Sequence, residues 1–163
     1  MYRRDGDALA LLLVHPGGPF WARKDDGAWS IPKGEYDDGE DALAVAKREF
    51  AEEVGAAVDG EFVDLGEVVQ PGRKVVRAFA VAGDVDVSLI QSNMFEMEWP
   101  PKSGRPRSFP EVDRAEWFAP DVARRKVLAG QRPFIARLLV ILGESGALSS
   151  ARPRESGDPG RRS

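Results

Sequence analysis

Three glutamates, Glu49, Glu52 and Glu53, occupy positions i, i+3 and i+4 of one stretch. If the stretch is helical, the carboxylates project from one face, because residues three and four apart are neighbours on a helix. Hard oxygen donors gathered without histidine or cysteine suit Mg²⁺ or Mn²⁺, whose shells are completed by water and phosphate oxygens. A solvated acidic helix face would show the same spacing. The three residues alone leave both interpretations open.

The surrounding residues extend this into a longer pattern of Gly, Glu and Arg. The pattern is Gly34-x5-Glu40-x7-Arg48-Glu49-Phe50-x-Glu52-Glu53-x-Gly55-Ala56. It resembles the Nudix box, so the chain is similar to the Nudix hydrolases, over roughly residues 7 to 142 when the neighbouring elements are included. Ala56 is smaller than the family's usual aliphatic residue, which concerns local packing rather than metal binding.

This resemblance implies an α/β fold, a single-domain α/β/α sandwich with a mixed sheet between helices. It also implies Mg²⁺-dependent, or Mn²⁺-dependent, hydrolysis of a phosphoanhydride bond in a nucleoside diphosphate linked to another moiety. The expected metal ligands are Glu49, Glu52, Glu53 and the carbonyl of Lys33. Arg48 is expected to orient the carboxylate of Glu52 through a charge-assisted bond.

Further residues outside the glutamate cluster are candidates by the same resemblance. Glu111 precedes a Trp-containing segment, as does the outlying carboxylate that completes the metal shell or acts as general base in several Nudix branches. Its alternative is a surface carboxylate in a loop. Cationic side chains that could grip a polyphosphate are Lys33, Lys102, Arg105 and Arg107.

Other residues of interest have both a functional and a structural interpretation. Gly34 is expected to permit a backbone turn. Glu40 either caps the glutamate helix or supports the metal site. Trp29 and Trp99 could stack a base or simply pack. The single histidine, His15, is expected in a minor substrate or structural role.

The substrate is less defined than the reaction. The Pro32-Lys33-Gly34 run resembles diadenosine polyphosphate hydrolases, so a dinucleoside polyphosphate is the leading substrate, although the Tyr typical of that branch is absent from residues 72–74. Pro71 has a spacing that resembles ADP-ribose hydrolases, or marks a hairpin turn. A damaged nucleoside triphosphate and a 5′-phosphorylated RNA end are further options. From another class, the domain could be a non-catalytic nucleotide- or RNA-binding Nudix module, which the intact box argues against.

The elements that must position these residues follow from hydrophobic periodicity and turn signals. Helical spacing of Leu43, Ala46, Phe50 and Val54 predicts a helix from Asp41 to a cap at Gly55. Pro120 starts a second helix and Pro133 to Leu142 forms a third. Predicted strands cover 8–14, 28–31, 62–69, 74–81, 93–99 and 114–118, with a proline-rich loop over 100–110.

Composition bounds the class of protein. The 163 residues suit one domain. The absence of cysteine excludes disulfide scaffolds and thiolate sites and fits a cytoplasmic location. A formal charge of −4 gives no global attraction to nucleic acid. The longest apolar run is far too short to span a membrane, and a secretory signal is not expected at the N-terminus. Oligomeric state and the natural start site are left open.

Residues 147–163 differ from the rest of the chain. They contain four Arg against one Glu and one Asp, and Leu148 is their only large apolar residue. Such a segment has no apolar face to bury. We therefore expect a Nudix domain over residues 1–146 and a disordered tail over 147–163.

Overall fold

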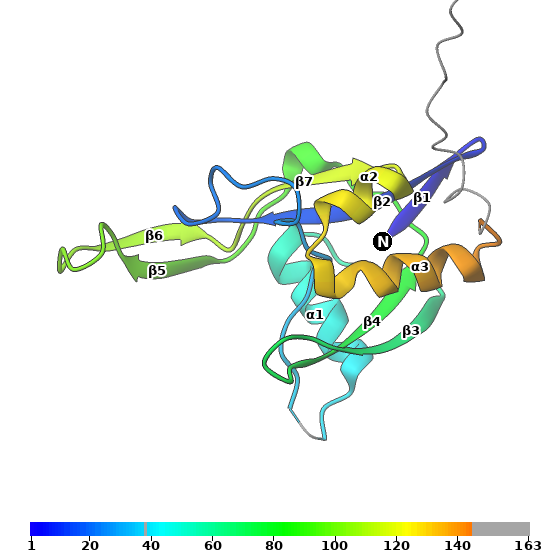
Figure 1. Cartoon of the computed structure of the whole chain (residues 1–163), viewed down its shortest axis with the longest axis horizontal. Coiled ribbons are helices and arrows are strands. Elements are labelled where there is room, and N and C mark those ends of the chain that lie inside the picture. Colours follow the sequence, from blue (N-terminus) through cyan, green and yellow to red (C-terminus); the bar gives the residue numbers. More distant parts are fainter. Residues whose placement is uncertain (38, 145–163) are drawn as a thin grey trace, which may run out of the picture.

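A computed structural model describes residues 1–37 and 39–144. Its strands are β1 (Tyr2–Asp5), β2 (Ala8–Pro16), β3 (Phe62–Val69), β4 (Val75–Val81), β5 (Met94–Glu98), β6 (Pro106–Pro110) and β7 (Val112–Phe118). Its α-helices are α1 (Ala42–Val54), α2 (Pro120–Lys126) and α3 (Arg132–Ile141), and its short 3₁₀ turns are η1 (Val87–Leu89) and η2 (Ala129–Gln131). The α/β class expected from the sequence is confirmed (Figure 1).

The core is arranged around β2, which is buried on both faces. Leu9, Leu11 and Leu13 pack into one apolar cluster with β4, α2 and α3. Leu12 and Val14 point the other way, into a cluster with α1 and β7. Successive side chains of a strand face opposite sides, so a nearly continuous apolar run is what a strand between two helical layers requires. The three layers form an α/β/α sandwich.

The sheet is less continuous than a single mixed sheet. The ladders are β1-β2-β7, β3-β4 and β5-β6, and each pairs its strands antiparallel. Parallel pairing within the described residues occurs only at the isolated bridges Tyr2 to Ala82 and Trp29 to Val127. The first of these bridges connects β1 with the end of β4. The mixed character of the expected sheet therefore rests on single bridges.

Helix α1 begins and ends where the sequence predicts. The side chain of Asp41 accepts hydrogen bonds from the backbone N–H groups of Leu43 (2.9 Å) and Ala44 (3.0 Å), which satisfies two donors of the first turn. Gly55 ends the helix with φ of 79°, a conformation that glycine adopts without a Cβ penalty. Phe50 and Val54 are buried against β2, which leaves the acidic face of the helix turned away from that core.

The segment 28–31 is not the strand that its composition predicts. Ser30 pairs with Val14 through two backbone hydrogen bonds of 2.8 and 2.9 Å, but no ladder continues from this bridge. Pro32 ends the run because it has no N–H to donate. The N–H of the preceding residue, Ile31, donates instead to the side-chain oxygen of Gln131 at 3.0 Å.

The proline-rich stretch expected as a loop contains a strand, β6, which pairs with β5. Pro106 and Pro110 stand opposite Glu98 and Met94, at the ends of the ladder, where a missing donor costs least. Figure 1 shows this β5–β6 arm extending away from the helices.

No α-helix within residues 1–37 and 39–144 has the length and apolar character that crossing a membrane requires. The predicted tail, 147–163, and its boundary at 146 lie outside the described residues.

Candidate metal and substrate site

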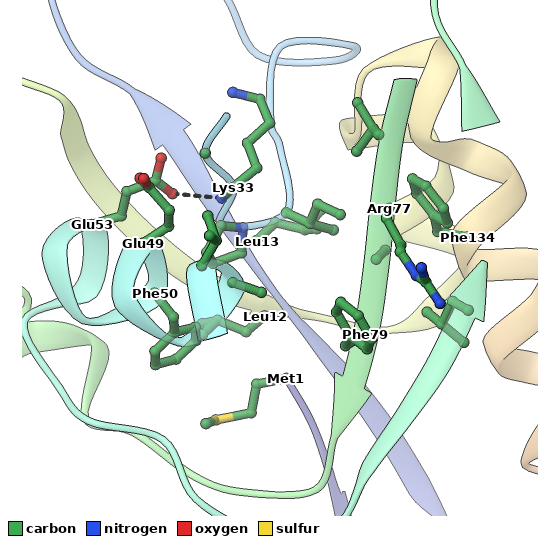
Figure 2. A pocket seen from close by; sticks show the side chains of 18 of the residues that line it. Met1, Leu12, Leu13, Lys33, Glu49, Phe50, Glu53, Arg77, Phe79 and Phe134 are labelled. Carbon is green, nitrogen blue, oxygen red and sulfur yellow. Dashed lines mark hydrogen bonds between the residues drawn. The ribbon is translucent and has the colours of Figure 1, made fainter. Parts of the chain in front are cut away.

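A cavity of about 890 Å³ lies between α1 and β4. This volume is typical of small-molecule sites. On one side the cavity is lined by three acidic side chains, those of Glu49, Glu53 and Glu111. On the β4 side it is lined by Lys74, which comes just before the strand, and by Arg77, which is on it. Its inner wall is apolar, with side chains from β2, β4 and α3 that include Leu13, Phe79 and Phe134 (Figure 2). The loop 31–37 runs along the same cavity.

Glu53 is tied to that loop. One of its carboxylate oxygens accepts a hydrogen bond of 3.0 Å from the backbone N–H of Lys33 (Figure 2). Burial raises the pKa of Glu53 to about 7, and the negative charges of Glu49 and Glu111 act in the same direction. The Lys33 N–H and ammonium oppose this rise. A carboxyl with this pKa changes protonation near neutral pH. The charges of Glu49, Glu111 and Lys33 all act on it.

Gly34 is notable for its close approach to Glu49 rather than for a turn. Gly34 does not have a positive φ, so the backbone turn that the sequence suggests does not explain a glycine here. A Cβ at this position would lie 1.9 Å from the carboxyl carbon of Glu49. Any other residue at this position would have to displace the side chain of Glu49.

Arg48 lies near three carboxylates, one that precedes α1 and two on the helix. Its guanidinium nitrogens lie 3.5 Å from Glu49 and 4.0 Å from both Glu52 and Glu40. The contact with Glu52 is an ion pair beyond hydrogen-bond length, so Glu49 is the nearer partner. Glu40 does not cap the helix, a role taken by Asp41, and it accepts a hydrogen bond of 2.8 Å from the N–H of Asp37.

Glu111 lies between β6 and β7 and reaches the same cavity. Its carbonyl accepts from the N–H of Gly17 (2.9 Å) and its own N–H donates to the carbonyl of Asn93 (2.8 Å). The peptide groups before and after Glu111 are therefore both held by hydrogen bonds. Two other acidic side chains that come before it in the sequence, Glu96 and Glu98, lie on β5 and do not line the cavity.

Glu52 differs from its neighbours, because it does not line the cavity and its side chain is 40% exposed. Over the described residues, no three acidic or histidine side chains converge into a ready-made ion cage. The donor chemistry nevertheless fits Mg²⁺, which keeps several waters and needs only one or two protein carboxylates. Glu49 and Glu53 supply these, at the place where the loop passes close to α1 at Gly34.

The structure does not bring all the expected cations together. Lys33 lines the cavity, whereas Lys102, Arg105 and Arg107 belong to the β5–β6 arm and its turn and do not. Lys74 and Arg77 line it instead, and each is paired with a carboxylate, Lys74 with Glu35 and Arg77 with Asp64. The available sequence signal was Arg77, which stands between the buried Val76 and Ala78 as the one polar residue of β4.

The remaining candidates have structural roles. His15 is fully buried, with Nδ1 2.9 Å from Asp113 and Nε2 2.7 Å from the carbonyl of Lys24. Trp29 packs edge-on against His15 and Phe118 and donates to Asp25. Trp99 packs against Phe20 on the arm.

Pro71 belongs to the turn between β3 and β4, as its hairpin interpretation predicts. Gln70 donates to the carbonyl of Lys74 at 2.8 Å, and Gly72 has φ of 84°.

Comparisons with known proteins agree with this architecture. A search of curated proteins gave no match. The structure is similar to a C. elegans Ap4A hydrolase in a binary complex, with 18% identity, 87% of this chain and 93% of that chain covered, and a TM-score of 0.58. It is also similar to the NUDIX domain of Shewanella oneidensis NrtR complexed with ADP ribose (16% identity, 86% and 82% covered, TM-score 0.56). A mutT/nudix family protein from Listeria innocua gives 18% identity, 91% and 92% coverage and a TM-score of 0.54.

These structural similarities, at identities below 25%, concern the fold. The sequence itself matches the family model described as NUDIX domain over residues 1–138, which is most of its length. Together with the glutamates that α1 presents beside the cavity, this match assigns the protein: the chain belongs to the Nudix family and is a Nudix hydrolase.

Proposed function

We propose that the protein is a Mg²⁺-dependent pyrophosphohydrolase whose substrate is a dinucleoside polyphosphate. The observation that carries the proposal is the cavity, where Glu49, Glu53 and Glu111 stand on one side and Lys74 and Arg77 on the other. A substrate bridging these two sides needs a chain of phosphates at one end and a base or nucleoside for the apolar inner wall. This combination of charge and apolar surface favours a nucleotide over a simple inorganic polyphosphate.

Each group of the chain has a separate task in this reaction. Glu49, Glu53 and the Lys33 carbonyl hold Mg²⁺, which when bound neutralises phosphate charge and lowers the pKa of water. Arg48 pairs with Glu49 and keeps its carboxylate toward the cavity. Glu53 and Glu111 are the two carboxylates on the cavity wall that can accept the proton of the attacking water. Lys33, Lys74 and Arg77 bind the remaining phosphates.

The number of cations supports a polyphosphate. Three cationic side chains line the cavity, and a chain of four or more phosphates offers each of them a partner beyond the bond that breaks. ADP-ribose has two phosphates, both of which lie next to the bond that is cleaved. It remains the alternative substrate, together with a nucleoside triphosphate.

One substrate panel tests this proposal. Purified full-length protein is incubated with Mg²⁺ and diadenosine tetra- and hexaphosphate, ADP-ribose, nucleoside triphosphates or triphosphorylated RNA, and products are separated by chromatography. Hydrolysis in ¹⁸O-labelled water identifies the phosphorus that is attacked. We expect the highest kcat/KM for a diadenosine polyphosphate.

A preference for ADP-ribose or for a triphosphate would overturn the substrate assignment and leave the reaction class intact. Binding of these nucleotides with Mg²⁺ but without turnover would instead support a non-catalytic binding module.

A further inference from the structure

Gln131 is a buried polar side chain that does not itself line the cavity. It is fully buried at the junction of η2 and α3. Its Oε1 accepts a hydrogen bond from the N–H of Ile31 (3.0 Å), and its Nε2 donates to the hydroxyl of Ser30 (3.0 Å), which itself donates to the carbonyl of Ile31 (2.7 Å). A buried amide with both ends satisfied is strongly held, because losing either partner leaves a polar group unpaired.

The bond to Ile31 replaces a strand partner. Segment 28–31 stops pairing after Ser30, and the side chain of Gln131 takes the donor that a neighbouring strand would have bound. At 100 residues' separation, this contact forms only when α3 packs on the core.

Only two residues separate this anchor from the catalytic carboxylate. Pro32 has no N–H and a fixed φ, which restricts the backbone rotation between Ile31 and Lys33. The N–H of Lys33 then donates to Glu53 at 3.0 Å. The backbone from Ile31 to Lys33 is thus held at one end by Gln131 and at the other by Glu53. A shift of Ile31 must move the Lys33 amide relative to the carboxylate.

We propose that Gln131 is a positioning residue for the Nudix site. Its amide fixes Ile31 and thereby sets where the backbone of Lys33 meets Glu53. Its effect on turnover rests on the proposed function, whereas its effect on the loop does not. Gln131 contacts neither substrate nor carboxylate and acts only through the three-residue connection.

The test compares Gln131→Met with Gln131→Glu in the full chain. Methionine keeps the volume but offers no acceptor for the Ile31 N–H, whereas glutamate keeps an oxygen at the same reach. Amide hydrogen exchange is followed by NMR without metal. The measured quantity is the ratio of the exchange rate of the Lys33 amide to that of the core amide of Leu13. We expect Gln131→Met to raise this ratio about tenfold and to lower kcat about tenfold with KM nearly unchanged. Gln131→Glu should restore both toward the wild-type values.

Leu139→Ala is the matched control. Leu139 is fully buried on α3, close in sequence to Gln131, but it does not line the cavity. It should lower the melting temperature by at least as much as Gln131→Met and leave the exchange ratio and kcat close to wild type.

An unchanged exchange ratio in Gln131→Met would overturn the proposal, and so would a raised ratio with wild-type kcat. Equal losses in Leu139→Ala would reduce Gln131 to a stabilising residue. If no substrate is hydrolysed, the proposed function fails, while the exchange ratio still decides whether Gln131 positions Lys33.

Discussion

Glu53 and Glu52 are adjacent in sequence but differ in their surroundings. Glu53 lines the cavity and binds the Lys33 amide, whereas Glu52 is half-exposed beside Arg48. The helix separates them by one residue step, which is enough to turn one side chain inward and the other outward. Individual side chains of α1 can therefore be tested separately.

Substitution of Glu52 or Glu53 by Gln removes one negative charge and nearly preserves shape. We expect kcat to fall at least about 10²-fold in Glu53→Gln, because Mg²⁺ then loses a charged ligand, and to fall less in Glu52→Gln, because this carboxylate does not line the cavity. The melting temperature of the metal-free protein should stay or rise, since carboxylate crowding is relieved. Steady-state kinetics and thermal unfolding measure both effects, and near-full activity in both variants contradicts the metal assignment.

Glu111→Gln and Glu116→Gln form a matched pair. Glu111 lines the cavity, whereas Glu116 is exposed on β7 and does not. Glu111→Gln should lower kcat more than it changes KM and alter the acidic limb of the pH profile. Glu116→Gln should be nearly silent. Equal behaviour of the two variants would exclude Glu111 as the outlying carboxylate.

The raised pKa of Glu53 predicts how metal-free stability depends on pH. The folded carboxyl titrates near pH 7, and the unfolded one near its ordinary value of 4.5. Between these values the folded state holds a proton that the unfolded state has lost. The free energy of unfolding should therefore fall as pH rises from about 5 to 7.

Urea unfolding in EDTA across this pH range measures this dependence. Glu53→Gln should flatten it, and a wild-type stability that rises over the same range would contradict the assigned shift.

Among the elements, the cations that line the cavity come from β4 and the turn before it, rather than from the β5–β6 arm as the sequence suggests. Lys102, Arg105 and Arg107 belong to the β5–β6 arm and its turn, which extend away from the helices (Figure 1), whereas Lys74 and Arg77 line the cavity. Lys74 pairs with Glu35, which is 82% exposed, so solvent screens this ion pair. A phosphate group can displace Glu35 at little cost.

Lys74→Met should raise KM about tenfold and leave kcat within about twofold, because one charge-assisted bond to substrate is lost. Lys102→Met is the control on the arm and should leave both constants unchanged. Steady-state kinetics with a diadenosine polyphosphate distinguishes them. A larger KM effect from Lys102→Met would return phosphate binding to the arm.

Local signals explain which elements could be predicted. Asp41, Gly55 and the periodic apolar residues determine α1 within a short stretch, and turn residues around Pro71 determine the β3–β4 hairpin. The strand β6 was hidden by its terminal prolines. That Glu49 and Glu53 share one side of α1 follows from helical spacing. Lys74 rather than Lys102 lines the cavity with these glutamates because of how distant segments pack. No local sequence pattern carries that information.

At the scale of the whole molecule, residues 147–163 offer one prediction that rests on composition alone. Deletion of these residues should leave kcat and the melting temperature unchanged, since Leu148 is their only large apolar residue. Thermal unfolding and kinetics of the truncated chain measure this. A large drop in melting temperature would show that the segment docks on the domain, and a rise in KM for RNA alone would indicate a contact with nucleic acid.

The strand order β1-β2-β7 has a consequence for synthesis on the ribosome. β2 is the most apolar strand and emerges early, yet its second partner, β7, is about 100 residues away, as the pairing of Leu13 with Glu116 shows. A nascent chain therefore carries β2 with an open apolar edge until the strand that covers it is translated. Unpaired edges of this kind recruit other chains. Slow translation upstream of residue 112 should increase aggregation of newly made protein, even though the finished fold buries that edge completely.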